Sequence, residues 1–179
     1  MRDIELMTKP PQSTEDRIEL QPAEPADYPA ILSLNTNAVP DVNLIDVQTL
    51  KSLHQQALAL IVARDRSDET IAGFLLILDE SADYSSVNYL FFKDSYPAFV
   101  YVDRVVVSPD HQRMGIGKRF YRHLFELGAD KPAACEVNVY PMNEQSLVFH
   151  QQLGFEKVAE QETEGGSKRV ALLMRPADS

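Results

Sequence analysis

Residues 98–128 join a strand-like run, a glycine loop and a helix-like run without a break. The run AFVYVDRVVV at 98–107 is apolar and rich in β-branched residues, and Pro109 ends it. The loop HQRMGIGK follows at 111–118. Four apolar residues then recur at the spacing of a helix: Ile116, Phe120, Leu124 and Leu127. A chain that passes from a strand through glycines into a helix is typical of α/β proteins, so this segment constrains the fold more than any other.

The rest of the chain supplies similar elements. Strands are predicted at 17–21, 58–64, 70–78, 134–140, 155–162 and 168–175, and helices at 25–37, from Asp46 onward, and from Asn143 to Leu153. Residues 79–97 are too polar for a core strand and rich in aromatic residues, and we interpret them as a long loop. The predicted order is β–α–α–β–β–β–α–β–α–β–β, an α/β fold with a mixed sheet flanked by helices. We expect residues 1–15 to form a flexible tail and residues 16–176 to form a single domain.

Composition and charge exclude several classes of protein. The 179 residues carry a formal net charge of −10, which argues against general nucleic-acid binding. The single cysteine, Cys135, excludes an internal disulfide and fits a reducing compartment. No run approaches the roughly 20 apolar residues of a membrane span, and the first residues have no signal-peptide core. We therefore expect a cytoplasmic protein that binds neither nucleic acid nor membranes.

Positive charge gathers around the glycine loop of this acidic chain. Residues 104–122 hold five of the seventeen Lys and Arg residues but a single acid, Asp110. Glycines let a ligand approach the backbone, and the amides at a helix N-terminus favour an anion such as phosphate. The loop lacks the first Gly and the Ser or Thr of a Walker A motif, where Gln112 and Arg119 stand, and Phe120 replaces the third glycine of a dinucleotide fingerprint. Taken alone, a G-x-G step before a helix is more often a structural turn than a phosphate site.

Two blocks of sequence resemble the signature of the GNAT superfamily of acyl-CoA N-acyltransferases. The first, VVVSPDHQRMGIGK at 105–118, is similar to the family's Q/R-x-x-G-x-G/A pyrophosphate loop and the strand before it. The second runs from Asn143 to FHQQLGF at 149–155 and is similar to the family's N-x-x-[AS]-x-x-x-Y-x-x-x-G-F. The order of the elements from residue 18 to residue 174 also resembles the family fold. The resemblance implies an acetyltransferase that uses acetyl-CoA as its cosubstrate.

The same resemblance implies where coenzyme A binds. In the family, the backbone of the strand before the loop pairs with the pantetheine arm, and the loop cradles the diphosphate. Carried over to this chain, the coenzyme site consists of the strand residues Val105, Val106 and Val107, the loop residues Gln112, Arg113, Met114, Gly115, Ile116, Gly117 and Lys118, and the helix residues Asn143, Ser146 and Phe149. No metal site is expected, because no His in the chain is spaced with Cys or acidic residues as metal ligands are.

Two residues are candidates for proton transfer. Strand alternation places Asp103 on one face with Tyr101 and Val105, so Asp103 is the carboxylate best placed to act as a base, directly or through a water. Its alternative role is to bind a cationic substrate or to pair near Arg104. His150 stands where the family commonly has the tyrosine that protonates the leaving sulfur. A histidine there is able to donate or to accept a proton, and its alternative role is structural.

The sequence says less about the molecule that accepts the acetyl group. The candidates for the substrate side are Tyr84, Tyr89, Tyr101 and Asn138. Glu136 shares a strand face with Asn138, and the net charge favours a small amine or a cationic peptide end. The predicted function is transfer of the acetyl group of acetyl-CoA to a primary amine of a small molecule or peptide, by direct attack in a ternary complex, with a homodimer left open. The alternative is a non-catalytic acyl-CoA-binding or regulatory domain that has lost the tyrosine acid.

Overall fold

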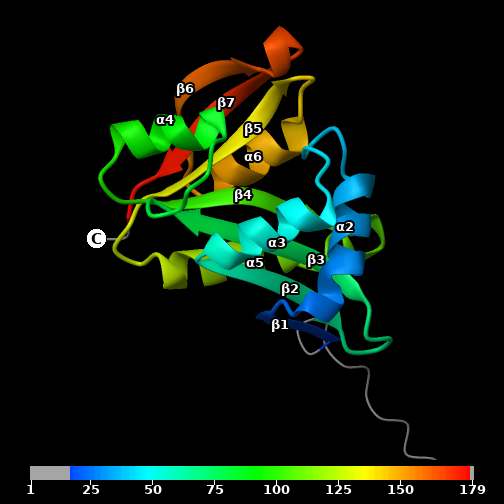
Figure 1. Cartoon of the computed structure of the whole chain (residues 1–179). Coiled ribbons are helices and arrows are strands. Elements are labelled where there is room, and N and C mark those ends of the chain that lie inside the picture. The colour runs from blue at the N-terminus through cyan, green and yellow to red at the C-terminus, as the bar shows by residue number, and fades with distance from the viewer. Residues whose placement is uncertain (1–16, 178–179) are drawn as a thin grey trace, which may run out of the picture.

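The computed structural model describes residues 17–177 and contains a seven-stranded mixed sheet (Figure 1). The strands are β1 (Ile18–Pro22), β2 (Ala59–Asp65), β3 (Ile71–Asp79), β4 (Val100–Val107), β5 (Ala133–Tyr140), β6 (Glu156–Thr163) and β7 (Lys168–Arg175). The helices are α2 (Tyr28–Asn37), α3 (Val47–Gln56), α4 (Val87–Ser95), α5 (Ile116–Leu127) and α6 (Glu144–Gln152). The strand order is β1-β2-β3-β4-β5-β7-β6, and β4 with β5 is the parallel pair of this sheet. The predicted class, an α/β fold with a mixed sheet flanked by helices, is confirmed.

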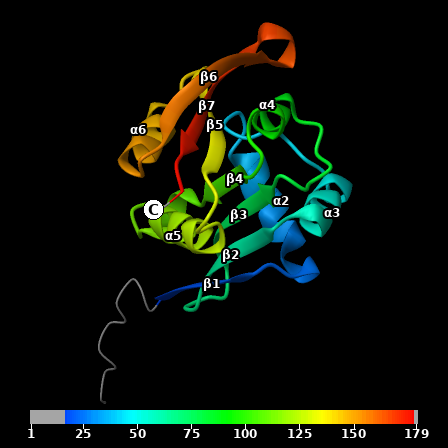
Figure 2. The ribbon, with the colours of Figure 1, turned by 90° about the vertical axis from the view of Figure 1, so that its left-hand side faces the viewer.

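Helices cover both faces of the sheet. In the turned view, α2, α3 and α4 lie on one side of the strands, and α5 and α6 lie on the other (Figure 2). Each face has its own apolar core, with Ile31 and Leu50 packed on the first side and Phe120 and Leu124 packed on the second. β3 lies between the two cores and is buried from Ala72 to Leu78, which explains its continuous apolar sequence.

The sheet opens between its two central strands. β4 and β5 run parallel but pair over three residues only, Val100–Val102 with Ala133–Cys135. Both strands continue past this point, so the backbone of β4 from Asp103 to Val107 has no β5 partner. A free strand edge beside a diverging neighbour is a place where an extended ligand can add to the sheet.

The loop predicted at 79–97 is wrong, because this segment contains a helix. α4 occupies Val87–Ser95, and its buried residues include Tyr89 and Phe92. Both rings pack against the ring of Phe99, the residue before β4. Tyr89 and Phe92 are therefore core contacts, spaced by three residues on the inner face of a helix.

The other predicted elements are confirmed, with boundaries that differ by a few residues. The tail predicted at 1–15 lies outside the described residues, and the extent of the domain at 16–176 stays a prediction. No helix within residues 17–177 has the length and apolar character needed to cross a membrane.

Candidate active site

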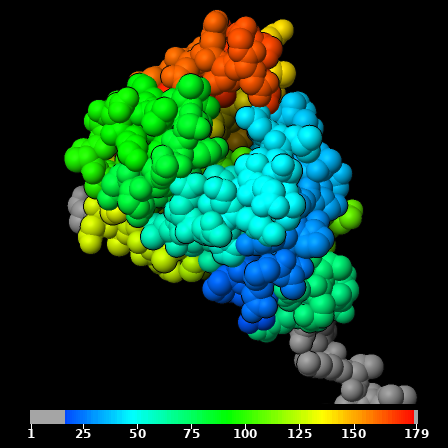
Figure 3. All heavy atoms as spheres, in the orientation of Figure 1, coloured from blue at the N-terminus to red at the C-terminus, as the bar shows by residue number. Residues whose placement is uncertain are grey.

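A polar cavity lies where β4 and β5 diverge. Its walls come from the α2–α3 connection, the segment before α4, both diverging strands, α5, α6 and the β6–β7 hairpin. In the space-filling view a hollow is visible between α4, the α2–α3 region and the β6–β7 hairpin (Figure 3). Of the predicted site residues, the cavity brings together Tyr84, Asp103, Val105, Asn138, Asn143, Ser146 and His150.

A β-bulge places Asp103 in this cavity. The register of β3 against β4 shifts between Leu76 and Ile77, and Asp103 is the extra residue of β4. The bulge breaks the alternation of the strand, so that Tyr101 packs on the side of α2–α4 and Val105 packs on the side of α5. The prediction that Tyr101, Asp103 and Val105 share one face is therefore wrong.

Asp103 is held in a buried ion pair with its neighbour. Arg104 Nε donates to Asp103 Oδ2 at 2.7 Å, and the two side chains are only 5% and 3% exposed. Arg104 Nη1 also donates to Asn35 Oδ1 at 2.8 Å and to the backbone oxygen of Asn43 at 3.1 Å. Burial and the charge of Asp103 together raise the pKa of Tyr84, which lines the same cavity. The charge of the Asp103 carboxylate is thus paired with that of Arg104 and the side chain is fixed in place, which fits the alternative role of pairing with Arg104 better than that of a free base.

Glu136 of β5 has the environment of a general base. Its carboxylate accepts hydrogen bonds from the Tyr101 hydroxyl and from Asn88 Nδ2, the latter at 3.3 Å. Gln161 Nε2 donates to Asn88 Oδ1 at 2.8 Å and thereby orients the Asn88 amide. Burial, with a smaller contribution from the nearby charge of Asp103, raises the pKa of Glu136 to about 7 despite these hydrogen bonds. A carboxyl group that titrates near neutral pH is suited to accept a proton from an attacking amine.

His150 and Tyr121 form a buried pair on the α5–α6 side of the cavity. His150 Nδ1 lies 2.7 Å from the backbone oxygen of Ser146, which can only accept, so Nδ1 carries the proton. His150 Nε2 lies 2.5 Å from Tyr121 Oη, and in the neutral ring it therefore accepts from the tyrosine. Burial lowers the pKa of His150, which favours the neutral ring. His150 replaces the tyrosine that the family commonly has at this position, but Tyr121 of α5 supplies a tyrosine hydroxyl to the same cavity.

The glycine loop ends in the N-terminus of α5. Gly115 at the N-cap has φ of 76°, in the left-handed region that favours glycine. A Cβ at Gly115 would meet no described atom within 4 Å, whereas a Cβ at Gly117 would lie 3.3 Å from the Phe149 ring of α6. The first amides of α5 have no partner within the helix. An open backbone with unpaired amides fits the diphosphate of coenzyme A.

Some predicted residues do not line the cavity. Tyr89 is fully buried, and its hydroxyl donates to two backbone carbonyl groups in and after β3, contrary to its predicted role in substrate binding. Tyr101 is also fully buried and reaches the site through its hydroxyl on Glu136. Val106 packs its side chain into the core under α2 and α3, so its backbone alone is available to a coenzyme.

Sequence reasoning did not assign a proton-transfer role to Glu136 or Tyr121. Glu136 alternates with Asn138 in an otherwise apolar strand, and two polar residues on one face of such a strand were a usable signal. Tyr121 follows Gly117 by one helical turn, so a helical projection from the loop would have pointed to it. Within residues 17–177, no group of three His, Cys, Asp or Glu side chains is placed to hold a metal ion.

Comparison with known families decides the assignment. The sequence model of the acetyltransferase (GNAT) family matches residues 24–155, a span that includes the glycine loop and α6. The chain belongs to the acetyltransferase (GNAT) family. As a GNAT acetyltransferase it is an acyltransferase with acetyl-CoA as its cosubstrate, and the open loop before α5 and the free edge of β4 fit that coenzyme. No protein with a curated description matches the sequence.

Solved structures share the GNAT fold at low sequence identity. The ribosomal-protein-S18-alanine N-acetyltransferase from Escherichia coli is 17% identical, with a TM-score of 0.67 over 90% of this chain and 95% of that one. NAA60 from Arabidopsis thaliana, in complex with a bisubstrate analogue, is 16% identical, with a TM-score of 0.72 over 90% and 98%. Nourseothricin acetyltransferase is 16% identical, with a TM-score of 0.61 over 90% and 99%. These likenesses establish the common fold.

Proposed function

We propose that this GNAT acetyltransferase transfers the acetyl group of acetyl-CoA directly to a primary amine, in a ternary complex, with Glu136 as the general base. The observation that carries the proposal is the placement of one partly buried carboxylate with a pKa near 7 in the cavity between β4 and β5. The glycine loop and the free edge of β4 border the same opening of the sheet. The proposed sites of the amine, the thioester and the base therefore adjoin one another.

The proposed reaction balances with the groups in the cavity. The neutral amine nitrogen attacks the thioester carbonyl carbon, a C–N bond forms and the C–S bond breaks. Glu136, whose carboxylate is oriented by Tyr101 and Asn88, takes the proton that the acceptor ammonium must lose before its nitrogen attacks. The second N–H proton, which is released as the amide forms, passes to the departing thiolate. The backbone amide of Val105, on the unpaired stretch of β4, is the donor proposed for the developing oxyanion. Tyr121 has a single hydroxyl proton, which it donates to His150 Nε2 in the resting site and turns to the departing sulfur as the C–S bond breaks.

The charge of the cavity supports a cationic acceptor. Three carboxylates line it, from Asp41, Asp103 and Glu136. The two cations in the wall are already engaged, Arg104 with Asp103 and Lys168 with Glu164 at 3.1 Å. Lys168 Nζ also donates to Asn43 Oδ1 at 2.9 Å, which joins the β6–β7 hairpin to the α2–α3 connection across the outer end of the cavity. The acceptor that suits this space is an ammonium group on a small molecule or at a peptide end.

The fold itself leaves the acceptor open. Among structures of this fold, one is named for an alanine of a ribosomal protein and another for nourseothricin. The test is thiol release from acetyl-CoA across a panel of small amines, amino acids and short peptides with free N-termini. We expect turnover with at least one amine and none with the matching N-methylated tertiary amine. Binding of acetyl-CoA without thiol release on any acceptor would favour the non-catalytic alternative.

Asp103 has a positioning and electrostatic role in this proposal, and Asp103→Asn tests it. The charge of Asp103 helps to raise the pKa of Glu136, so its removal should lower that pKa. We expect the acid limb of the pH–rate profile to move to lower pH by roughly one unit, with activity retained on the plateau. The profile is measured by thiol release, with circular dichroism to confirm folding, because the change leaves Arg104 without its ion-pair partner. Loss of activity at every pH in a folded variant would instead make Asp103 the base.

A further inference from the structure

The residues at the entry to β1 contact the glycine loop at both of its ends. On one flank, Arg17 and His111 meet at the carboxylate of Asp65, the last residue of β2. On the other flank, Arg119 in the first turn of α5 donates from Nη1 to the backbone oxygen of Ile18 at 2.7 Å. We call these five residues the β1 clamp: Arg17, Ile18, Asp65, His111 and Arg119. The loop Gln112–Gly117 lies between its two contacts in sequence.

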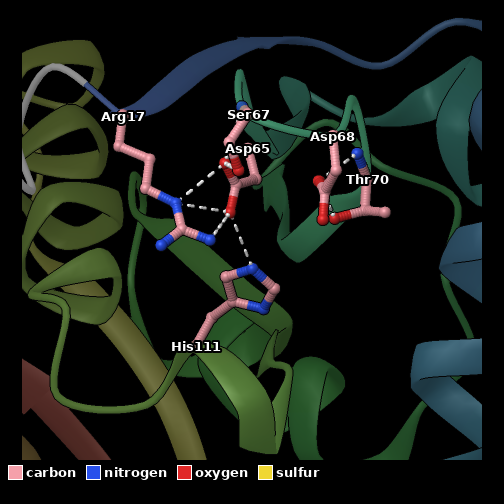
Figure 4. A network of polar contacts seen from close by, with 6 residues as sticks. All are labelled: Arg17, Asp65, Ser67, Asp68, Thr70 and His111. Carbon is pink, nitrogen blue, oxygen red and sulfur yellow. Dashed lines mark hydrogen bonds and ion pairs between the residues drawn. The ribbon is translucent and has the colours of Figure 1, made fainter. Parts of the chain in front are cut away.

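Asp65 is the centre of the clamp (Figure 4). Its side chain is 0% exposed, and it accepts from Arg17 Nε at 2.8 and 3.0 Å, with Arg17 Nη2 at 2.5 Å. The backbone amide and the hydroxyl of Ser67 donate to it at 2.9 and 2.7 Å, and His111 Nε2 lies 3.1 Å away. A carboxylate only accepts, so the histidine donates from Nε2. The positive charge of Arg17 therefore compensates the buried Asp65 carboxylate, and this carboxylate holds the His111 ring in place.

The clamp continues into the backbone of the loop. His111 ends the short 3-10 turn Pro109–His111, whose backbone is tied to the sheet through Ser108, with Ser108 N donating to the Ala72 oxygen at 2.8 Å. His111 N in turn donates to the Ser108 oxygen at 2.9 Å. Both the main chain and the side chain of this turn are thus fixed one residue before Gln112. The glycines after it have no side chains to hold them, so the contacts at the two ends of the loop add to the packing of Met114 and Ile116 on the core beside α5.

We propose that Arg17 and Asp65 are positioning residues for coenzyme A, because the β1 clamp holds the glycine loop in the conformation that receives the diphosphate. The inference rests on the proposed coenzyme site. It adds two residues that affect the binding of the coenzyme without contacting the coenzyme or the acceptor. Preorganised backbone amides bind an anion more tightly than amides that must first be ordered. Loosening the clamp therefore weakens coenzyme binding and leaves the chemistry in the cavity unchanged.

The test compares Arg17→Met with Glu19→Gln in the full chain. Glu19 forms an exposed ion pair with Arg66 at 3.1 Å across the same strand pair, so the control also removes an ion pair from β1 but leaves the clamp intact. By calorimetry we expect Arg17→Met to raise the Kd of acetyl-CoA about tenfold and the control to leave it within twofold. With saturating acetyl-CoA, kcat should match the wild type. Hydrogen exchange should become faster in peptides covering 108–119 and stay unchanged in β6 and β7.

Asp65→Asn is a second variant for which we expect the same shift in the Kd of acetyl-CoA. If Asp65→Asn does not fold, Arg17→Met alone tests the inference. An unchanged Kd in folded Arg17→Met would overturn the inference, and so would a raised Kd accompanied by faster exchange across the whole chain. Failure of the proposed function is a separate result, because in that case the wild-type protein itself would not bind acetyl-CoA.

Discussion

Replacing Glu136 with glutamine is expected to lower kcat/KM at least a hundredfold, because the amide cannot take the proton that the attacking amine must lose. Positioned general bases contribute about 10²–10⁴-fold to rate. The wild-type rate should rise with pH as Glu136 loses its proton near pH 7 and then level off. The variant should lack this rise. Thiol release measured from pH 5.5 to 9 with any accepted amine gives both results.

The same substitution is expected to stabilise the protein at alkaline pH. The folded-state pKa of Glu136, about 7, lies above its ordinary value of 4.5, so the folded protein holds this proton more tightly than the unfolded chain. The corresponding stability is fully present below about pH 4.5 and is lost as pH rises through 7. At pH 8 the wild type carries a largely buried charge that glutamine lacks. We expect the free energy of unfolding of Glu136→Gln to exceed that of the wild type by about 1–2 kcal/mol at pH 8, with a smaller difference at pH 5.

A matched control separates these effects from a general change in charge. Glu126→Gln removes an exposed carboxylate on the outer side of α5, so both its activity and its stability should equal those of the wild type. Turnover of Glu136→Gln within threefold of the wild type would show that another group accepts the proton. A gain in stability together with lost activity is expected where a buried functional charge is kept at the expense of stability.

Local patterns were sufficient for the parts of the site that local structure builds. The glycine loop, its preceding strand and α5 follow from an apolar run, a proline and a helical repeat, all within residues 98–128. The stripe of Asn143, Ser146 and His150 follows from helical spacing in α6, and the structure places all three on the cavity. Such features need no knowledge of what packs against them.

Features that depend on neighbouring elements were missed or wrongly placed. The bulge at Asp103 comes from the pairing of β4 with β3, and a period of two along one strand cannot reveal an extra residue. α4 was interpreted as a loop because its polar residues hid the buried pair Tyr89 and Phe92. The basicity of Glu136 arises from its desolvation in the fold, which outweighs the opposing hydrogen bonds from Tyr101 and Asn88, 35 and 48 positions away. Sequence patterns identify the residue types, whereas the tertiary fold decides which carboxylate is able to act as the base.

Replacing Tyr121 with phenylalanine is expected to lower kcat roughly 10–100-fold, because the departing sulfur loses its hydrogen-bond donor. The Kd of acetyl-CoA should change less than threefold, since the Tyr121 hydroxyl is hydrogen-bonded to His150 of α6 and its removal leaves the glycine loop unaltered. Tyr140→Phe is the control, because it removes a hydroxyl from a tyrosine that is 62% exposed. The readouts are kcat by thiol release and Kd by calorimetry.

His150→Phe should reproduce much of this loss, because Tyr121 then has no acceptor to orient its hydroxyl. The double variant should be no slower than the slower single variant, since the two side chains act as one unit. Independent roles would instead multiply the two losses and would contradict the paired arrangement. Loss of the hydroxyl also leaves buried His150 Nε2 without a partner, so Tyr121→Phe should cost about 1–3 kcal/mol in the free energy of unfolding. Rates are therefore compared well below the melting transition of each variant, where a slow step in the folded protein is the remaining cause of a lower kcat.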